Sequence, residues 1–187
     1  MPKNELFDKN EVIKKAINLF WMKGYEATSL SDLTEKLGIG KGSFYNTFGS
    51  KRKLFDTCLS AVHEGGFIGV KQLLNQESDP ILGIRRYMEF HSENLLKDPQ
   101  SKGCLIVNTS TEMAHDKGIE SFLLENNQSM KSIIVDYLAG GRLSDRADVI
   151  ADSILIYTTG VSVLSKFIKD RNRFKASLDQ FIQSIES

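Results

Sequence analysis

The chain has 187 residues, of which 41% are hydrophobic and 26% are charged, and its formal net charge is zero. This composition supports a buried core and excludes a disordered chain. Cys58 and Cys104 lie far apart without CxxC spacing, and neither a signal-peptide pattern nor an uninterrupted apolar run of about 20 residues is visible. We therefore expect a soluble, cytoplasmic protein that does not cross a membrane.

Basic and acidic residues are distributed unevenly along the chain. Residues 1–60 carry ten basic and seven acidic residues, a net charge of +3, which leaves −3 for the rest. From Lys36 to Phe55 there are five basic residues and no acidic one. If these residues share a face, they form a surface suited to a polyanion such as DNA. On charge alone, a solvated basic face without a partner explains the pattern equally well.

Apolar residues recur at helical spacing throughout the chain, and no segment shows the alternation typical of a strand, so the predicted fold is all-α. The first predicted helix begins after the capping residue Asp8 and ends at Gly24. Ser29 and Asp32 predict the cap of a second helix over residues 30–37.

Longer helices are predicted in the C-terminal part. One begins after Ser50, and another begins at Asp79 and Pro80 and ends before Pro99. Later helices are expected over residues 103–114, 118–138 and 145–168, with a short last helix that carries Phe174, Leu178, Phe181, Ile182 and Ile185.

The apolar run at residues 149–168 has more apolar side chains than a single stripe needs for packing within its own chain. Together with the last helix, it is predicted to contact a second subunit. A central helix buried on all sides by its own domain would give the same periodicity.

The stretch GIGKGSFYNTFGSK, from Gly38 to Lys51, first suggests a phosphate-binding loop. A Walker-type loop needs G-x-x-x-x-G-K-[ST], but Glu35 stands at the first glycine position and Gly42 follows Lys41. The dinucleotide fingerprint fails as well, and the three histidines are too scattered for a zinc site on a helix. We therefore predict no enzymatic activity, no metal and no cofactor.

The same stretch fits a helix-turn-helix motif better. In SLSDLTEKLGIGKGSFYNTF, Leu33, Leu37 and Phe44 form the core between two helices, and Gly38 makes the turn. Glycines at positions 40 and 42 let the start of the second helix approach a duplex closely. The outward-facing side chains, which suit phosphates and base edges, are Lys41, Ser43, Tyr45, Asn46 and Thr47.

The block from Val12 to Leu59, with its GYEATS, LGIGKGSFYNTF and SK segments, resembles the N-terminal domain of TetR-family transcriptional regulators. The resemblance implies an all-helical homodimer, with a three-helix DNA-binding domain at residues 1–50 and a larger helical effector-binding and dimerisation domain at 51–187. It implies a DNA-backbone contact at Thr28 or Ser29, contacts from the second helix of the motif at Lys41, Gly42, Ser43, Tyr45 and Asn46, and a further contact at Lys51. Gly40, Asn46, Thr47 and Gly49 depart from the common pattern of the family, so the operator sequence stays open.

The C-terminal part is expected to hold an effector pocket. The segment GCLIVNTSTEMA is similar to one in electrophile-responsive repressors of the family, and Cys104 occupies the position of their sensor cysteine. A buried structural cysteine is the favoured interpretation, because a reactive thiol needs a lowered pKa and Lys102 is the only basic neighbour in the sequence. The expected effector is apolar or aromatic, with an electrophile second. The predicted pocket residues are Tyr87, Phe90, His91, Cys104, Asn108, Phe122 and Tyr157.

These observations predict a sequence-specific DNA-binding transcriptional regulator, a repressor that a small-molecule effector releases from its double-stranded DNA operator. A helical small-molecule-binding protein without DNA readout is the alternative, and an enzyme comes third.

Overall fold

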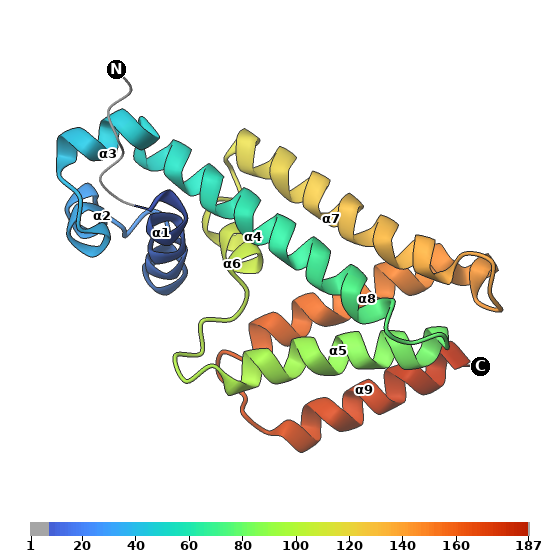
Figure 1. Cartoon of the computed structure of the whole chain (residues 1–187). Helices are drawn as coiled ribbons and strands as arrows, with labels where there is room; N and C mark the ends of the chain where they lie inside the picture. Colours follow the sequence, from blue (N-terminus) through green and yellow to red (C-terminus); the bar gives the residue numbers. More distant parts are fainter. Residues whose placement is uncertain (1–7, 187) are drawn as a thin grey trace.

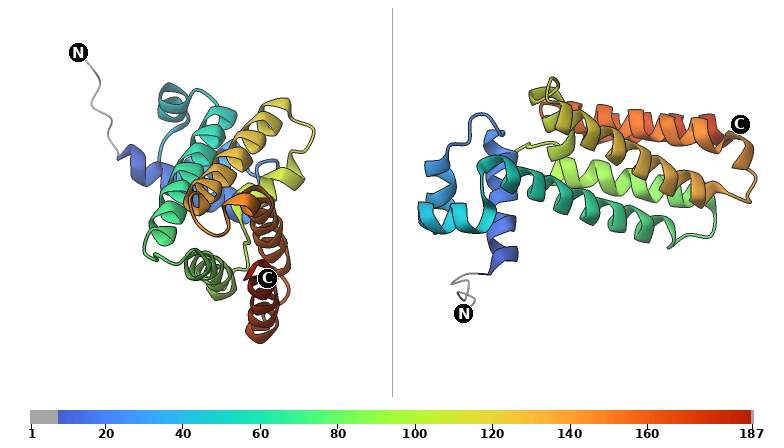
Figure 2. Two further views of the ribbon diagram at one scale, coloured as in Figure 1. Left: turned by 90° about the vertical axis from the view of Figure 1, so that its right-hand side faces the viewer. Right: turned by 90° about the horizontal axis from the view of Figure 1, so that it is seen from above.

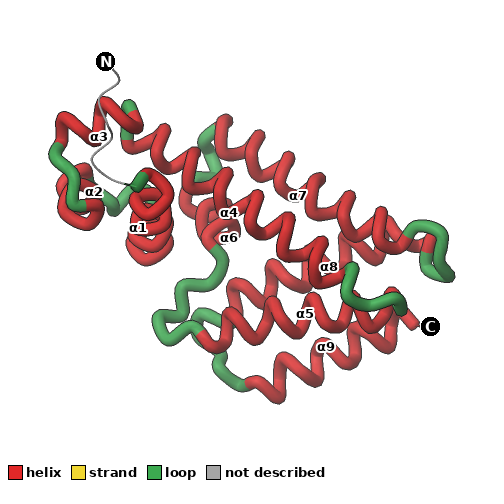
Figure 3. Tube along the Cα trace, viewed as in Figure 1, coloured by secondary structure: helices red, strands yellow, loops and turns green. Residues whose placement is uncertain are grey.

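The computed structural model describes residues 8–186, and these form α-helices joined by short connections, with no strand in this range (Figure 3). The all-α prediction is confirmed. The N-terminal helices lie at one end of the molecule, and the chain's C-terminus lies at the other end (Figure 2).

The first three helices are α1 (Lys9–Lys23), α2 (Leu30–Leu37) and α3 (Lys41–Phe48). Asp8 caps α1, as predicted, by accepting a hydrogen bond from the Asn10 amide. Ser29 and Asp32 form the predicted capping box of α2, each side chain accepting from the other residue's backbone N–H. Local signals therefore determine where these helices begin.

A hydrophobic cluster holds α1, α2 and α3 together and extends beyond them. Phe20, Leu33 and Phe44 are fully buried, and Phe55 from α4 (Lys51–Leu74) meets Phe20 edge-on with ring centroids 4.9 Å apart. The cluster continues to Ile119, so the first half of α4 packs with the N-terminal helices. A domain boundary at residue 50 remains a prediction, since the apolar contacts run across it.

The C-terminal part comprises α5 (Pro80–Lys97), α6 (Leu105–Glu112), α7 (Lys117–Leu138), α8 (Ala147–Leu164) and α9 (Arg171–Glu186), with a 3-10 turn at Ser144–Arg146. Asp79 caps α5 and Pro80 is its first residue, as predicted. The helices predicted at 103–114 and 145–168 are shorter in the structure. Gly103 has a φ of 71°, which helical backbone does not adopt, and the chain after Leu164 tightens into turns.

The arrangement of α4 and α5 creates an internal space. The two helices meet at the turn of residues 75–79 and diverge toward the N-terminal domain (Figure 1). Helix α6 packs against α4, α7 and α8, while α9 packs against α5. Residues of α1, α4, α5, α6, α7 and α8 line the wedge between α4 and α5.

Helix α8 has two apolar faces. Ile150, Ile154 and Val161 are buried in the core, whereas a second row faces solvent: Val149, Ile156 and Val163, at 70%, 74% and 42% exposure. By length and composition alone, Ser144–Leu164 could also cross a bilayer, although 39% of its 18-residue apolar window is buried within the protein. The exposed row contradicts the alternative of a helix buried on all sides by its own domain, and the contact with a second subunit remains a prediction.

The apolar stripe of helix α9 packs within its own chain. Its apolar residues Phe174, Leu178, Ile182 and Ile185 are buried in the chain's own core. Helix α5 covers the apolar stripe of α9, so a contact of α9 with a second subunit remains a prediction that this stripe does not support.

Candidate DNA interface and effector cavity

The helix-turn-helix consists of α2, the turn at residues 38–40, and α3. Leu33, Leu37, Ile39 and Phe44 are buried between the helices, as predicted. The turn residue Gly38 has φ 69° and ψ 30°, a left-handed conformation that glycine adopts without strain. Five predicted DNA-contacting residues are exposed together along α3, namely Lys41, Gly42, Ser43, Tyr45 and Asn46, and Thr47 is half-buried.

Gly40 and Gly42 serve no packing need within the chain. A Cβ atom added at either position would meet no other atom within 4 Å, and neither residue has a positive φ. The missing side chains therefore leave open surface at the start of α3. This supports the prediction that a duplex approaches the helix closely there.

The N-terminus of α3 is electropositive. Its N-cap, Gly40, provides no side chain to bond the first-turn amides, and the first turn has no acidic residue. Unpaired N–H groups and the helix dipole favour an anion at this position, and the exposed Lys41 adds a full charge. A DNA phosphate fits these features.

Thr28 requires a correction. Its side chain is fully buried and its Oγ1 donates to the Gly24 carbonyl at 2.5 Å, so it does not contact DNA from this position. Ser29 is exposed, and its hydroxyl already belongs to the capping box of α2, donating to Asp32 at 2.7 Å. Of the two predicted backbone contacts, only Ser29 lies on the surface.

Lys51 also has a structural role. Its Nζ donates to the carbonyl oxygens of Tyr25 and Thr28, both at 2.9 Å, and lies 4.2 Å from the centroid of the Tyr25 ring. These contacts tie the start of α4 to the turn before α2. Lys51 thus positions the helix-turn-helix, and only its remaining N–H is left for a phosphate.

Arg52 connects the start of α4 to the beginning of α7. Its guanidinium makes a bidentate contact with Asp116 and bonds Asp56. The hydrogen bonds from Arg52, followed by one from the Ile119 amide, lower the pKa of Asp116 to about 2. Since Lys51 and Arg52 are engaged within the protein, the solvent-facing cations of the basic stretch are Lys36, Lys41 and Lys53.

The wedge between α4 and α5 holds a cavity of about 630 Å³. Four of the seven predicted pocket residues line it: Tyr87, Phe90, His91 and Cys104. Its wall includes no Asp, Glu, Lys or Arg among the described residues. The volume lies in the range usual for small-molecule sites.

Three predicted pocket residues lie elsewhere. Asn108 bonds the Lys102 carbonyl and the Lys166 ammonium, and Phe122 packs in the N-terminal hydrophobic cluster. Tyr157 packs against Phe181 with the rings tilted and their centroids 5.4 Å apart, and its hydroxyl donates to the Phe174 carbonyl. Helical spacing alone could not tell which side of each helix faces the cavity.

Other lining residues were missed from the sequence. Trp21 reaches the cavity from α1, His63 and Asn126 pair across it, and three glycines of α4 form part of its wall: Gly65, Gly66 and Gly69. The glycines could have indicated this part of the cavity wall from the sequence. The segment HEGGFIGV lies inside a predicted helix, where glycine is unfavourable.

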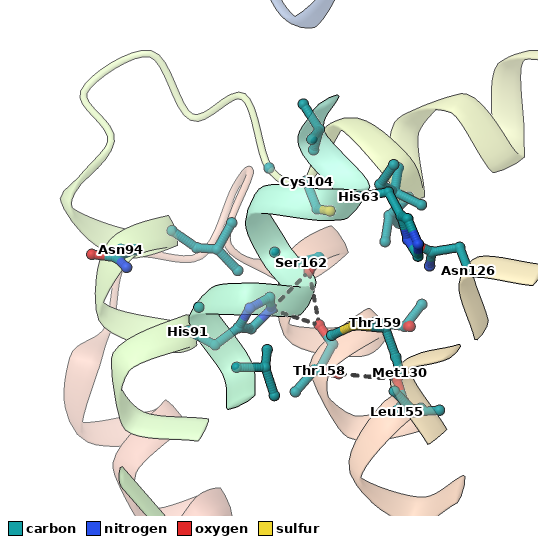
Figure 4. A pocket seen from close by; sticks show the side chains of 18 of the residues that line it. His63, His91, Asn94, Cys104, Asn126, Met130, Leu155, Thr158, Thr159 and Ser162 are labelled. Atoms are coloured by element: carbon teal, nitrogen blue, oxygen red, sulfur yellow. Dashed lines mark hydrogen bonds between the residues drawn. The ribbon is translucent and has the colours of Figure 1, made fainter. Parts of the chain in front are cut away.

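His91 contributes a neutral polar group to the cavity. Its Nε2 lies 3.1 Å from Ser162 Oγ and 3.3 Å from the Thr158 carbonyl, and the carbonyl contact requires the proton on Nε2 (Figure 4). Burial lowers the pKa of His91, and the bond to Thr158 opposes this only in part. The imidazole is therefore uncharged at neutral pH.

Cys104 lies at the N-terminus of α6 and faces the cavity. Burial raises the pKa of its thiol, while the amides of Val107 and Ile106 act in the opposite direction. The thiol is therefore protonated at neutral pH, whereas a reactive cysteine needs thiolate character. Within the described chain, no group of three or more His, Cys, Asp or Glu could hold a metal ion.

Two contacts connect the cavity to the DNA-binding helices. Trp21 Nε1 donates to the Gly103 carbonyl at 3.1 Å, next to Cys104. At the other end of α6, the Glu112 carboxylate accepts from the amides of Tyr25 and Glu26 at 3.0 and 2.9 Å. A side chain at Gly24 would place its Cβ 2.6 Å from Glu112 Oε1, so this glycine permits the close approach.

The exposed donors of α3 lie on a helix-turn-helix that is attached to a helical part with a cavity, and this arrangement is that of a DNA-binding protein. A family model described as bacterial regulatory proteins, tetR family, matches residues 12–58. Residues 12–58 therefore form a TetR-family DNA-binding domain, and the chain is a DNA-binding transcriptional regulator.

Relatives extend the similarity over the whole chain. The uncharacterized HTH-type transcriptional regulator YezE of Bacillus subtilis (strain 168) is 29% identical over 170 residues, which cover 90% of this chain and 84% of YezE. The HTH-type transcriptional repressor ComR of Escherichia coli (strain K12) is 26% identical over 193 residues, 96% of this chain and 86% of ComR.

A solved structure has the same fold. A cysteine mutant of the TetR family transcriptional regulator CifR, complexed with a 26-base-pair double-strand operator DNA, superposes with a TM-score of 0.85 at 21% identity. The match covers 97% of this chain and 98% of the CifR chain.

Proposed function

We propose that this regulator is a cytoplasmic, non-enzymatic repressor that binds a double-stranded operator as a homodimer and is released by a small molecule in the α4–α5 cavity. The observation that carries the proposal is the exposed face of α3, where donor side chains surround an electropositive helix start. Relatives named as repressors, such as ComR, support the direction of regulation.

The residues of α3 divide into two roles. Lys41, Ser43 and Asn46 are exposed near the start of the helix, from which side chains reach base edges in the major groove. Tyr45, 52% exposed, bonds a phosphate through its hydroxyl, together with the first-turn amides. Lys51 acts mainly by holding α4 against the turn before α2.

The outer face of α8 supports the dimer. Val149, Ile156 and Val163 lie seven residues apart, so they form one row along the helix, and exposed Phe167 follows it. A row of large apolar side chains is what a second copy of the same helix would bury in a two-fold contact.

Effector binding would release the DNA through α6, because this helix contacts both the cavity and the turn before α2. Cys104, Ile106 and Val107 line the cavity, and Glu112 on the same helix holds the Tyr25 and Glu26 amides. An effector that shifts α6 therefore shifts the turn before α2. The ligand must favour the arrangement with low DNA affinity, by about 1–3 kcal/mol in typical systems.

Fluorescence anisotropy tests the proposal with two labelled duplexes, the DNA upstream of the chain's own gene and a scrambled version of it. We expect a preference for the upstream duplex, an affinity that falls steeply with salt, and loss of the preference in Asn46→Ala. Equal binding of both duplexes at every salt concentration would refute operator recognition and favour a small-molecule-binding protein without DNA readout, which the cavity alone also permits.

A further inference from the structure

The cavity has an unusual wall on α4. Val62, Gly66, Gly69 and Leu73 follow one another at helical spacing along the side that lines the cavity, with Gly65 beside them. Three glycines within one helix cost about 1 kcal/mol each relative to alanine. None of the three has a positive φ, so the backbone does not require glycine at these positions.

The three glycines leave open space, and no neighbouring atom would prevent a side chain at their positions. A Cβ atom added to Gly65, Gly66 or Gly69 would meet nothing within 4 Å. Packing in the described protein therefore gives no reason for their lack of side chains. Their common effect is to widen the cavity on the side of α4, opposite the exposed rim residue Phe90 of α5.

Two pairs of hydrogen-bonded polar side chains, each with a histidine, belong to the cavity wall. His91 and Ser162 form one pair, between α5 and α8, and His63 and Asn126 form the other, between α4 and α7 (Figure 4). With Asn126 Oδ1 as acceptor, His63 Nδ1 carries the proton, so the Asn126 amide N–H groups remain as donors. No Asp, Glu, Lys or Arg lines the described wall to compensate an ionised ligand.

We propose that the effector is an uncharged, mainly apolar molecule with at least one hydrogen-bonding group, and that its bulk lies against the wall that Gly65, Gly66 and Gly69 leave free on α4. This inference rests on the proposed role of the cavity as the effector site. An anionic ligand would lose its hydration without gaining a cation, which costs several kcal/mol.

Two fluorescent probes that differ by a single charge test the ligand class. N-phenyl-1-naphthylamine is neutral, and 1-anilinonaphthalene-8-sulfonate is the same skeleton with a sulfonate. Trp21, the single tryptophan of the chain, lines the cavity, so energy transfer from it to the probe reports binding. We expect the neutral probe to bind at least about tenfold more tightly. Equal or tighter binding of the sulfonate would overturn the proposal.

Two substitutions at one position test the place of binding. Gly69 is half-buried on the cavity wall, and Gly69→Ala and Gly69→Leu both remove the backbone freedom of glycine, but only leucine fills the space. We expect Gly69→Ala to keep the neutral probe's affinity within about threefold and Gly69→Leu to lower it about tenfold or more. Ala61→Leu, on an exposed position of α4 outside the cavity, should leave it unchanged.

Each outcome decides the question. If Gly69→Leu binds the neutral probe as well as the unaltered chain does, the glycine wall is not the binding surface. If Gly69→Ala already abolishes binding, helix flexibility is needed and available space is not the reason for the glycines. Should Gly69→Leu fail to fold, the two probes on the unaltered chain still decide the ligand class. None of these measurements uses DNA, so the ligand proposal and operator binding can fail independently of each other.

Discussion

Single glycines of the helix-turn-helix have different physical functions. Gly38 is required by its backbone, since φ 69° strains any residue with a side chain, whereas Gly42 lies in ordinary helical backbone with open space around it. The first is a requirement of folding. The second has no reason in the chain's own packing, which fits the proposed approach of a duplex to α3.

This difference predicts opposite results for two alanine variants. Gly42→Ala should raise the free energy of unfolding by about 0.5–1 kcal/mol, because alanine favours helix, and should weaken operator binding by about 1–3 kcal/mol. Gly38→Ala should lower the free energy of unfolding by about 1 kcal/mol. Urea titrations and anisotropy on the same preparations measure both. A Gly42→Ala variant with full operator affinity would show that the duplex does not approach this position.

At the scale of elements, the N-terminal helices are joined to the C-terminal helices by polar contacts as well as by α4. Glu112 bonds α6 to the turn before α2, and Arg52 bonds the start of α4 to Asp116, the N-cap of α7. These contacts lie at the helix ends that would have to move if the DNA-binding domain shifted.

Glu112→Ala should uncouple the two sites. The Tyr25 and Glu26 amides would lose an accessible acceptor, which costs about 0.5–1.5 kcal/mol of stability, and α6 would no longer pull on the turn. We expect unchanged binding of the neutral probe to the cavity but a smaller loss of operator affinity when it binds. Glu120→Ala, which removes a surface pair with Lys117, is the control. If probe binding lowered the operator affinity equally in both variants, the connection between the cavity and the DNA-binding helices would run through other residues.

The Arg52–Asp116 contact predicts a pH dependence. The pKa of Asp116 is lowered from 3.8 to about 2 in the folded chain, so the stabilisation is present above about pH 4 and is lost as the pH falls toward 2. Asp116→Asn keeps a capping oxygen but removes this titration. Its stability should therefore change less between pH 4 and 2 than that of the unaltered chain, as measured by acid-dependent urea unfolding. The exposed Asp145→Asn variant should retain the full dependence.

At the scale of the whole molecule, the outer row of α8 is the surface that matches a second copy of the chain. The sequence also suggested Phe181 for this contact, but Phe181 is half-buried against Tyr157, so a charge there would disturb the chain's own packing. Ile156, 74% exposed, tests association without disturbing the core.

Ile156→Glu should give a monomer that keeps its helical content. Because two linked DNA-binding domains bind far more tightly than one, operator affinity should fall about a hundredfold or more. Sedimentation, circular dichroism and anisotropy provide the three measurements. Leu124→Glu, at an equally exposed apolar position on α7, should stay dimeric. If Ile156→Glu sediments as a dimer, the subunit contact lies on another face.

The sequence by itself determined the helices and the helix-turn-helix. Ser29 with Asp32, Gly38, and Asp79 with Pro80 act on backbone groups within a few residues of themselves, so their effect can be predicted without the rest of the chain. The apolar spacing likewise determined that Phe44 faces inward while Lys41 and Asn46 face outward.

Only the tertiary structure decided which distant residues meet. Trp21 reaches a cavity next to Cys104, 83 positions away in the sequence, while Asn108 turns from it toward Lys166. Lys51, read from its position as a phosphate contact, is held by two carbonyls before α2. These outcomes depend on how whole helices cross, which is set by the packing of many side chains together and leaves no local pattern in the sequence.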